Sequence, residues 1–122
     1  RIGGFERNFT NAAWEKIDKF MAEYPAVLRE FENMFTRNRI FMERTIGAGP
    51  INAERALNYD FTGPNLRAAG VDYDVRFHTP YSSYEDVEFE IPVGSTGDCY
   101  DRFLVRNGEM WQSLRIIEQA YH

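Results

Sequence analysis

The chain has 122 residues, 43% of them apolar and 16% aromatic, which suits one compact domain with a buried core rather than two. The 14 basic and 19 acidic residues give a net charge of −5, which argues against nucleic-acid binding because phosphate contacts need clustered Lys and Arg. No apolar run is long enough to cross a bilayer, and the single Cys99 excludes both an internal disulfide and a thiolate metal cage made by this chain alone.

Both ends of the sequence favour a piece of a longer protein. The chain opens with Arg1-Ile2-Gly3-Gly4 and lacks an initiator Met. It closes at His122 inside a helical pattern that has no Gly or Pro stop signal. We therefore expect residues 1–122 to form a single fragment, an internal section of a larger domain.

The first predicted element is a long amphipathic helix that begins at Thr10 or Asn11, either of which can cap its free N–H groups. Pro25 lies inside the pattern, and we expect a kink or a break there because proline removes a hydrogen bond and clashes with the preceding turn. The apolar residues of this helix recur at spacings of three and four: Trp14, Ile17, Met21, Tyr24, Leu28, Phe31 and Phe35.

Shorter elements follow in the middle of the chain. A helix is predicted over residues 38–45, and Asn52 is expected to cap the next one. Pro64 suits the first position of a helical turn that Gly70 stops. Residues 71–80 alternate only loosely and are predicted to be extended or irregular.

The last third of the chain combines a predicted strand with a long helix. Residues 87–91 read Val-Glu-Phe-Glu-Ile, an alternation that predicts a half-buried strand ended by Pro92. Asp98 is expected to cap the final helix, and Gly108 inside that helix predicts close packing. The residues on or near one face of it are Phe103, Asn107, Met110, Trp111, Leu114, Ile117 and Tyr121. The fold class is therefore mainly α (α+β), with long packed helices and a short strand or loop region.

The sequence offers few candidates for chemistry. Residues 47–49 read Gly-Ala-Gly, like the start of a phosphate loop, but no strand precedes them, so a helix terminator is the better interpretation. Asp72, Asp74 and His78 could ligate a metal, yet ion pairs of the two aspartates with Arg67 and Arg76 are favoured. His78 has no nucleophile beside it and is interpreted as a structural histidine. We assign neither a catalytic residue nor a metal ligand.

Arginine dominates the basic residues, of which only Lys16 and Lys19 are lysines. Guanidinium groups are preferred where bidentate pairing with carboxylates is partly buried. The structural interpretation is a buried set of ion pairs that locks helices together; the functional one is a charged layer beside a redox centre or proton path, and both can hold. The ion-pair candidates are Arg44, Arg67, Asp72, Asp74, Arg76, Asp98, Asp101, Arg102 and Arg106.

Seven motifs stand in a fixed order through nearly the whole chain, densest from residue 38 onward. They occupy residues 38–41 with 44–45, 62–68, 72–76, 80–84, 89–94, 97–98 with 100–102, and 109–110 with 112–117. Together they resemble the D subunit of bacterial respiratory complex I, the NADH:quinone oxidoreductase component related to the large subunit of nickel–iron hydrogenases. The opening Arg-x-Gly-Gly segment is also similar to one in that family.

The resemblance implies a fragment from the central to C-terminal part of the hydrogenase-large-subunit-like fold. The parent would help to transfer electrons from the terminal iron–sulfur cluster of the B subunit to quinone, in an enzyme that couples NADH oxidation to ion translocation. It would lie in the peripheral arm, on the cytoplasmic side of the bacterial inner membrane. Its expected partners are other complex I subunits, especially the B subunit and the C-type neighbour.

The resemblance also implies that this chain alone binds no cofactor. The B subunit ligates the cluster, and the family's quinone-contacting His and Tyr lie upstream of the Arg-x-Gly-Gly segment. Arg1, Gly3 and Gly4 match that segment and are expected near the quinone and the cluster. The isolated fragment should be an inactive scaffold, and its exposed helix faces should make it self-associate.

Two alternatives remain open. A fragment of a nickel–iron hydrogenase large subunit would come from a parent with two Cys pairs near its termini, and Cys99 belongs to no pair. A non-catalytic helical interaction module would use the same motifs only to stabilise helix packing.

Overall fold

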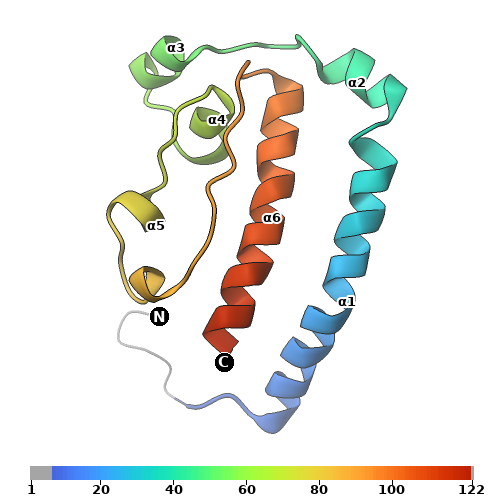
Figure 1. The fold of residues 1–122 in the computed structure, drawn as a ribbon, viewed down its shortest axis with the longest axis vertical. Helices are drawn as coiled ribbons and strands as arrows, with labels where there is room; N and C mark the ends of the chain where they lie inside the picture. Colours follow the sequence, from blue (N-terminus) through green and yellow to red (C-terminus); the bar gives the residue numbers. More distant parts are fainter. Residues whose placement is uncertain (1–6, 122) are drawn as a thin grey trace.

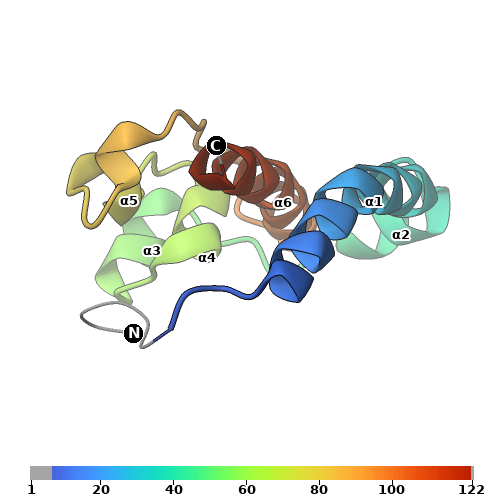
Figure 2. The same cartoon turned by 90° about the horizontal axis from the view of Figure 1, so that it is seen from below.

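Two long helices and several short ones build the structure, a computed structural model that describes residues 7–121. The long helices are α1 (Asn11–Phe35) and α6 (Cys99–Tyr121). The short elements are α2 (Arg39–Thr45), α3 (Ala53–Asn58), α4 (Gly63–Ala68), α5 (Val75–His78) and the 3-10 turn η1 (Tyr84–Asp86). In Figures 1 and 2, α6 lies between α1 on one side and α3, α4 and α5 on the other. The described chain is mainly helical, as predicted.

Helix α1 begins where its cap predicts. The Thr10 hydroxyl accepts a hydrogen bond from the Ala13 N–H at 3.3 Å. The helix then runs without interruption through Pro25, so the expected break is absent, while a kink stays a prediction. Next to the proline, the Tyr24 hydroxyl reaches the Met110 sulfur at 3.7 Å, so this part of α1 contacts α6.

One face of α6 packs against α1, on the side that the apolar spacing predicts. The rings of Phe31 and Phe103 lie 5.8 Å apart between centroids. The Glu32 carboxylate accepts hydrogen bonds from the Asn107 amide and the Trp111 indole, both at 2.7 Å. Aromatic contacts and a shared, half-buried acceptor therefore join the two long helices.

The opposite face of α6 carries the segment that was predicted to be a strand. That prediction is wrong: within residues 7–121 there is no strand, and residues 87–91 form extended chain without a neighbouring strand. Two α6 side chains accept the hydrogen bonds that a neighbouring strand would otherwise accept. Gln119 accepts from the Glu88 N–H at 2.8 Å, and Gln112 accepts from the Glu90 N–H at 2.9 Å. The alternation was correct for burial, since Phe89 is half-buried and the glutamates are exposed.

Close contact between this segment and α6 depends on Gly108. A Cβ atom there would lie 3.0 and 3.1 Å from side-chain atoms of Pro92, which confirms the predicted close packing. Asp98 caps α6 as predicted, since its carboxylate accepts from the Asp101 N–H at 2.8 Å.

The short helices follow their caps. Asn52 caps α3 as predicted, and Asn38, the first residue of the helix predicted over 38–45, caps α2. Helix α5 corrects the expectation of irregular chain over 71–80: the Asp74 side chain accepts from the Arg76 N–H at 2.9 Å and starts one helical turn. A small core under α3 and α4 contains Ala56, Leu66 and Ala69, with Ile51, Phe61 and Val71 packed against it. Among the helices of the described residues, none combines the length and apolar character that a membrane crossing requires.

Candidate functional site

A buried charge network centred on Arg67 joins α4, α5 and α6. Arg67 and Asp74 are only 5% and 4% exposed. The Arg67 guanidinium pairs with the Asp74 carboxylate at 3.3 Å and with the Glu109 carboxylate, and it also donates to the Tyr73 carbonyl at 3.0 Å. Arg76 adds a bidentate contact to Asp74, at 2.6 and 3.0 Å.

The local structure explains why these four charges meet. Arg67 lies in a fully buried stretch of α4, and Asp74 is the residue that caps α5. Glu109 lies one turn after the buried Val105, on the face of α6 that meets α4. Two guanidinium groups and two carboxylates balance one another, so the network can remain buried without net charge.

Asp74 and Arg76 favour each other's ionised form. Hydrogen bonding from the Arg76 guanidinium holds the pKa of Asp74 below its ordinary value, although burial acts in the opposite direction. The same bond from Asp74 raises the pKa of Arg76. Asp74 is therefore a fixed anion near neutral pH rather than a proton donor or acceptor.

The carboxylates of Asp98 and Asp101 accept hydrogen bonds from backbone N–H groups and form no ion pair with an arginine among the described residues. The Asp98 carboxylate accepts from the Gly47 N–H at 2.7 Å, and Asp101 accepts from the Ser95 and Thr96 N–H groups at 2.7 and 2.6 Å. Burial acts to raise the pKa of both carboxyls, but these backbone hydrogen bonds outweigh it and lower both. The loop at residues 47–49 therefore donates to an internal carboxylate, which supports the helix-terminator interpretation.

Arg102 and Arg106 likewise contact uncharged oxygens. Arg102 donates to the carbonyls of Gly97 and Gly49, the latter at 3.1 Å. Arg106 donates to the Asn65 side chain at 2.9 Å. Neither arginine forms an ion pair with the described residues: Arg102 holds the loops at Gly49 and Gly97, and Arg106 joins α6 to α4.

The remaining candidates lie apart from the network. Arg44 and Asp72 are exposed and make no ion pair within residues 7–121. The sequence predicted that Arg67 and Arg76 would pair with Asp72 and Asp74. In the structure both arginines pair with Asp74. Arg1, Gly3 and Gly4 lie outside the described residues.

Sequence reasoning missed Glu109 as a member of the network. Glu109 lies outside the apolar face predicted for the final helix. Its position one turn after the apolar Val105 was the available signal, because a carboxylate beside a buried side chain needs a partner. Arg67 and Glu109 are separated by 42 positions in the sequence, so local patterns could not show that they meet.

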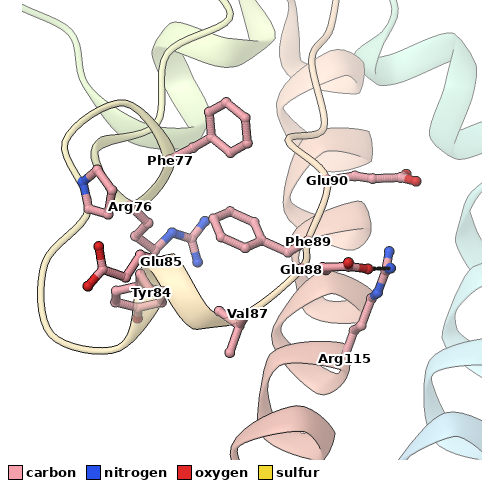
Figure 3. Close-up of a pocket in the computed structure, with 10 residues that line it drawn as sticks. Arg76, Phe77, Tyr84, Glu85, Val87, Glu88, Phe89, Glu90 and Arg115 are labelled. Carbon is pink, nitrogen blue, oxygen red and sulfur yellow. Dashed lines mark ion pairs between the residues drawn. The ribbon is translucent and has the colours of Figure 1, made fainter.

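A cavity of about 520 Å³ opens beside the network, between α5, η1 and the segment 87–90 (Figure 3). The Arg76 guanidinium lies 5.1 Å from the Phe89 ring centroid, and Arg115 pairs with Glu88 at 3.5 Å. Both cations that line the cavity are therefore engaged by residues of this chain.

The described residues contain no metal-binding group of three or more His, Cys, Asp or Glu side chains. The His78 ring stacks on Tyr73 at 5.2 Å between centroids, and its Nδ1 lies 3.1 Å from the Asp74 carbonyl oxygen. Within residues 7–121, no Ser, Thr or Cys side chain forms a hydrogen bond with His78. The charged residues of the site are therefore suited to fixing the backbone of α4, α5 and the loops before α6.

Fold and site together define a helical scaffold whose buried charges bind one another. Residues 1–122 match the family model of the 49 kDa subunit of respiratory-chain NADH dehydrogenase, and the chain belongs to this family. It is 73% identical over 120 residues to a D subunit of the NADH-quinone oxidoreductase of Cytophaga hutchinsonii, the one numbered D 2. It is 63% identical over 120 residues to the D subunit of the corresponding enzyme of Flavobacterium johnsoniae.

These matches include almost the whole of this chain but only part of each relative. Each includes 98% of this chain but only 30% of the Cytophaga protein and 29% of the Flavobacterium protein. A match to a C/D subunit of the NADH-quinone oxidoreductase of Aquifex aeolicus, 48% identical, covers 98% of the chain and 20% of that protein. The chain thus spans about 30% of the length of the first two relatives.

Proposed function

We propose that this chain is part of a D subunit of NADH-quinone oxidoreductase, and that the longer subunit takes part in electron transfer to quinone coupled to ion translocation. The observation that carries the proposal is the family match over residues 1–122, with relatives of that name at up to 73% identity. The match favours this function over a nickel–iron hydrogenase large subunit and over a stand-alone helical module.

The contribution of this chain is structural. The Arg67 network and the backbone contacts of Asp98 and Asp101 fix α4, α5 and the start of α6 relative to one another. We propose that this rigid part supports the wall of the quinone and cluster region. Arg1, Gly3 and Gly4 are the residues that we propose lie nearest to it.

An iron–sulfur cluster does not fit the described donor set, which has the single Cys99 and no group of metal-ligating side chains. The proposed electron transfer therefore involves no cluster held by the described residues. The proposal instead has the B subunit hold the cluster, with quinone bound at its interface with the longer subunit.

The proposal includes a place in an assembly. The longer subunit assembles with other subunits of the complex, the B subunit and a C-type neighbour among them, peripherally on the cytoplasmic side of the bacterial inner membrane. The fused name of the Aquifex relative, a C/D subunit, supports the C-type neighbour.

The test compares two preparations. The isolated 122-residue chain should show no NADH- or quinol-linked turnover, because the proposed cluster and quinone contacts lie outside it. Restoring the full-length subunit to cells that lack it should restore NADH:quinone turnover in their membranes. Turnover by the isolated chain, or membranes that stay inactive with a stably expressed full-length subunit, would contradict the proposal.

A further inference from the structure

A second cavity, of about 480 Å³, lies between the C-terminal end of α1 and the first half of α6. Its polar lining comes from both helices, with Glu32 and Thr36 on the α1 side and Asn107 on the α6 side. Leu104 and Gly108 of α6 supply an apolar part of the wall. The cavity therefore lies on the side of α6 that meets α1, away from the Arg67 network.

Asn107 has a side-chain oxygen without a partner at this cavity. The residue is 6% exposed, and its Oδ1 atom accepts no hydrogen bond from residues 7–121. Its amide nitrogen donates to the Glu32 carboxylate at 2.7 Å. Because a carboxylate only accepts hydrogen bonds, this contact fixes the orientation of the amide and identifies the unpartnered atom as the oxygen.

A second unpartnered atom lines the same cavity from the other helix. The Thr36 hydroxyl oxygen is buried and forms no hydrogen bond with the described residues. The Glu32 carboxylate does not satisfy either atom, since its Oε1 accepts from both the Asn107 amide and the Trp111 indole at 2.7 Å. Buried polar atoms in folded proteins are rarely left without a partner, because the loss of hydration is costly.

We propose that this cavity binds ordered water molecules that donate to the Asn107 oxygen and pair with the Thr36 hydroxyl. Water suits both atoms, because it can donate to an amide oxygen and either donate to or accept from a hydroxyl. The cavity is far larger than the volume of one water molecule, about 30 Å³ in the liquid. The proposed site goes beyond the proposed function and contributes a hydrated contact between α1 and α6.

The lining favours water over a cation. Arg37 lines the cavity with an exposed guanidinium, which would repel a second positive charge. Among the described residues there is no group of three His, Cys, Asp or Glu side chains that could hold a metal ion. A neutral molecule that both donates and accepts hydrogen bonds therefore fits the site best.

A crystal or cryo-EM structure that contains the full-length subunit, at a resolution that shows ordered water, tests the proposal directly. We expect density for a water oxygen within about 3.2 Å of Asn107 Oδ1, and within the same distance of the Thr36 hydroxyl for that water or another. A protein side chain that donates to the Asn107 oxygen, or a cavity without ordered density, would overturn the proposal.

The variant Thr36→Val gives an independent outcome through the sign of its effect. It should lower the Tm of the full-length subunit by about 1–3 °C, because valine keeps the shape but loses the hydrogen bond with water. Without bound water, the same change would remove an unpaired buried hydroxyl and raise the Tm.

Thr62→Val is the matched control, since Thr62 is exposed and makes no side-chain cap bond to α4. Its Tm should stay nearly unchanged. A Tm of Thr36→Val that equals or exceeds that of the control would overturn the proposal. Neither measurement depends on turnover, so failure of the proposed electron-transfer function would be seen separately.

Discussion

At the scale of single residues, Arg67 determines how the polar interior is arranged. An arginine side chain has five N–H donors and no acceptor, so the burial of Arg67 at 5% exposure requires acceptors from the surrounding chain. Asp74, Glu109 and the Tyr73 carbonyl supply them from three parts of the chain. Removing one of these acceptors leaves buried positive charge uncompensated.

Glu109→Ala should therefore destabilise the chain by about 3 kcal/mol, as expected for breaking a buried ion pair. The matched control is Glu43→Ala, which removes the exposed Arg39–Glu43 pair within α2 and should cost at most about 0.5 kcal/mol. Urea denaturation of the two variants measures the difference in free energy of unfolding. Equal losses would show that the Arg67–Glu109 pair does not stabilise the fold.

Stability should also fall in acid. The pKa values of Asp74, Asp98 and Asp101 are lowered in the folded chain, so the unfolded state binds more protons once the pH falls below the ordinary carboxyl range of about 4. Their stabilising contribution is complete above that range and is lost as the pH falls through the folded-state values. Urea titrations between about pH 7 and about pH 3 measure this, and Asp74→Asn should reduce the dependence. A free energy of unfolding that stays constant over this range would contradict it.

At the scale of elements, sequence patterns predicted those helices whose signals are local. Thr10, Asn38, Asn52 and Asp98 each mark a helix start, because a side-chain cap depends only on the next three residues. The alternation at 87–91 predicted burial correctly but not a strand, since strand pairing depends on a neighbour that no local pattern reveals. The spacing of apolar residues likewise did not predict the second contact face of α6, because that face contains polar residues and a glycine: Asp101, Gly108, Gln112 and Gln119.

The turn before α6 provides a sharp test of element packing. Gly97 has φ +65°, and a Cβ atom there would lie 1.9 Å from the Ile51 carbonyl oxygen. Gly47 has φ +72°, but a Cβ atom there would meet nothing within 4 Å. Gly47→Ala should therefore cost only about 1–2 kcal/mol of backbone strain, and Gly97→Ala should cost clearly more. Thermal unfolding of both variants measures this; similar Tm values would contradict the predicted crowding.

At the scale of the whole molecule, α6 separates two layers, with α1 and α2 on one side and α3, α4 and α5 on the other (Figures 1 and 2). The sequence predicted the mainly helical class and, through seven ordered motifs, the family. It suggested the pairing of Asp74 with Arg67 and Arg76, which are close in sequence, but not the meeting of Arg67 with Glu109. Long-range partners follow from how the layers pack, which local patterns do not specify.

The isolated chain should associate weakly with itself. Exposed apolar side chains on both layers, among them Val27 on α1 and Phe77 on α5, leave surfaces that water solvates poorly. Sedimentation velocity over a range of concentrations should show a rising apparent mass, and replacing Phe20 and Val27 by Gln should reduce that rise. A chain that remains monomeric at high concentration would contradict the prediction.

The position of α6 between the layers has a consequence for how the chain comes apart. Helix α1 buries Leu28 against α6, and α4 also packs on α6, but among the described helices α1 shares no substantial contact with α3, α4 or α5. We therefore expect the chain to unfold as two cooperative units joined through one shared helix. Opening of α1 should leave the Arg67 network intact, whereas unfolding of α6 should disrupt both units at once.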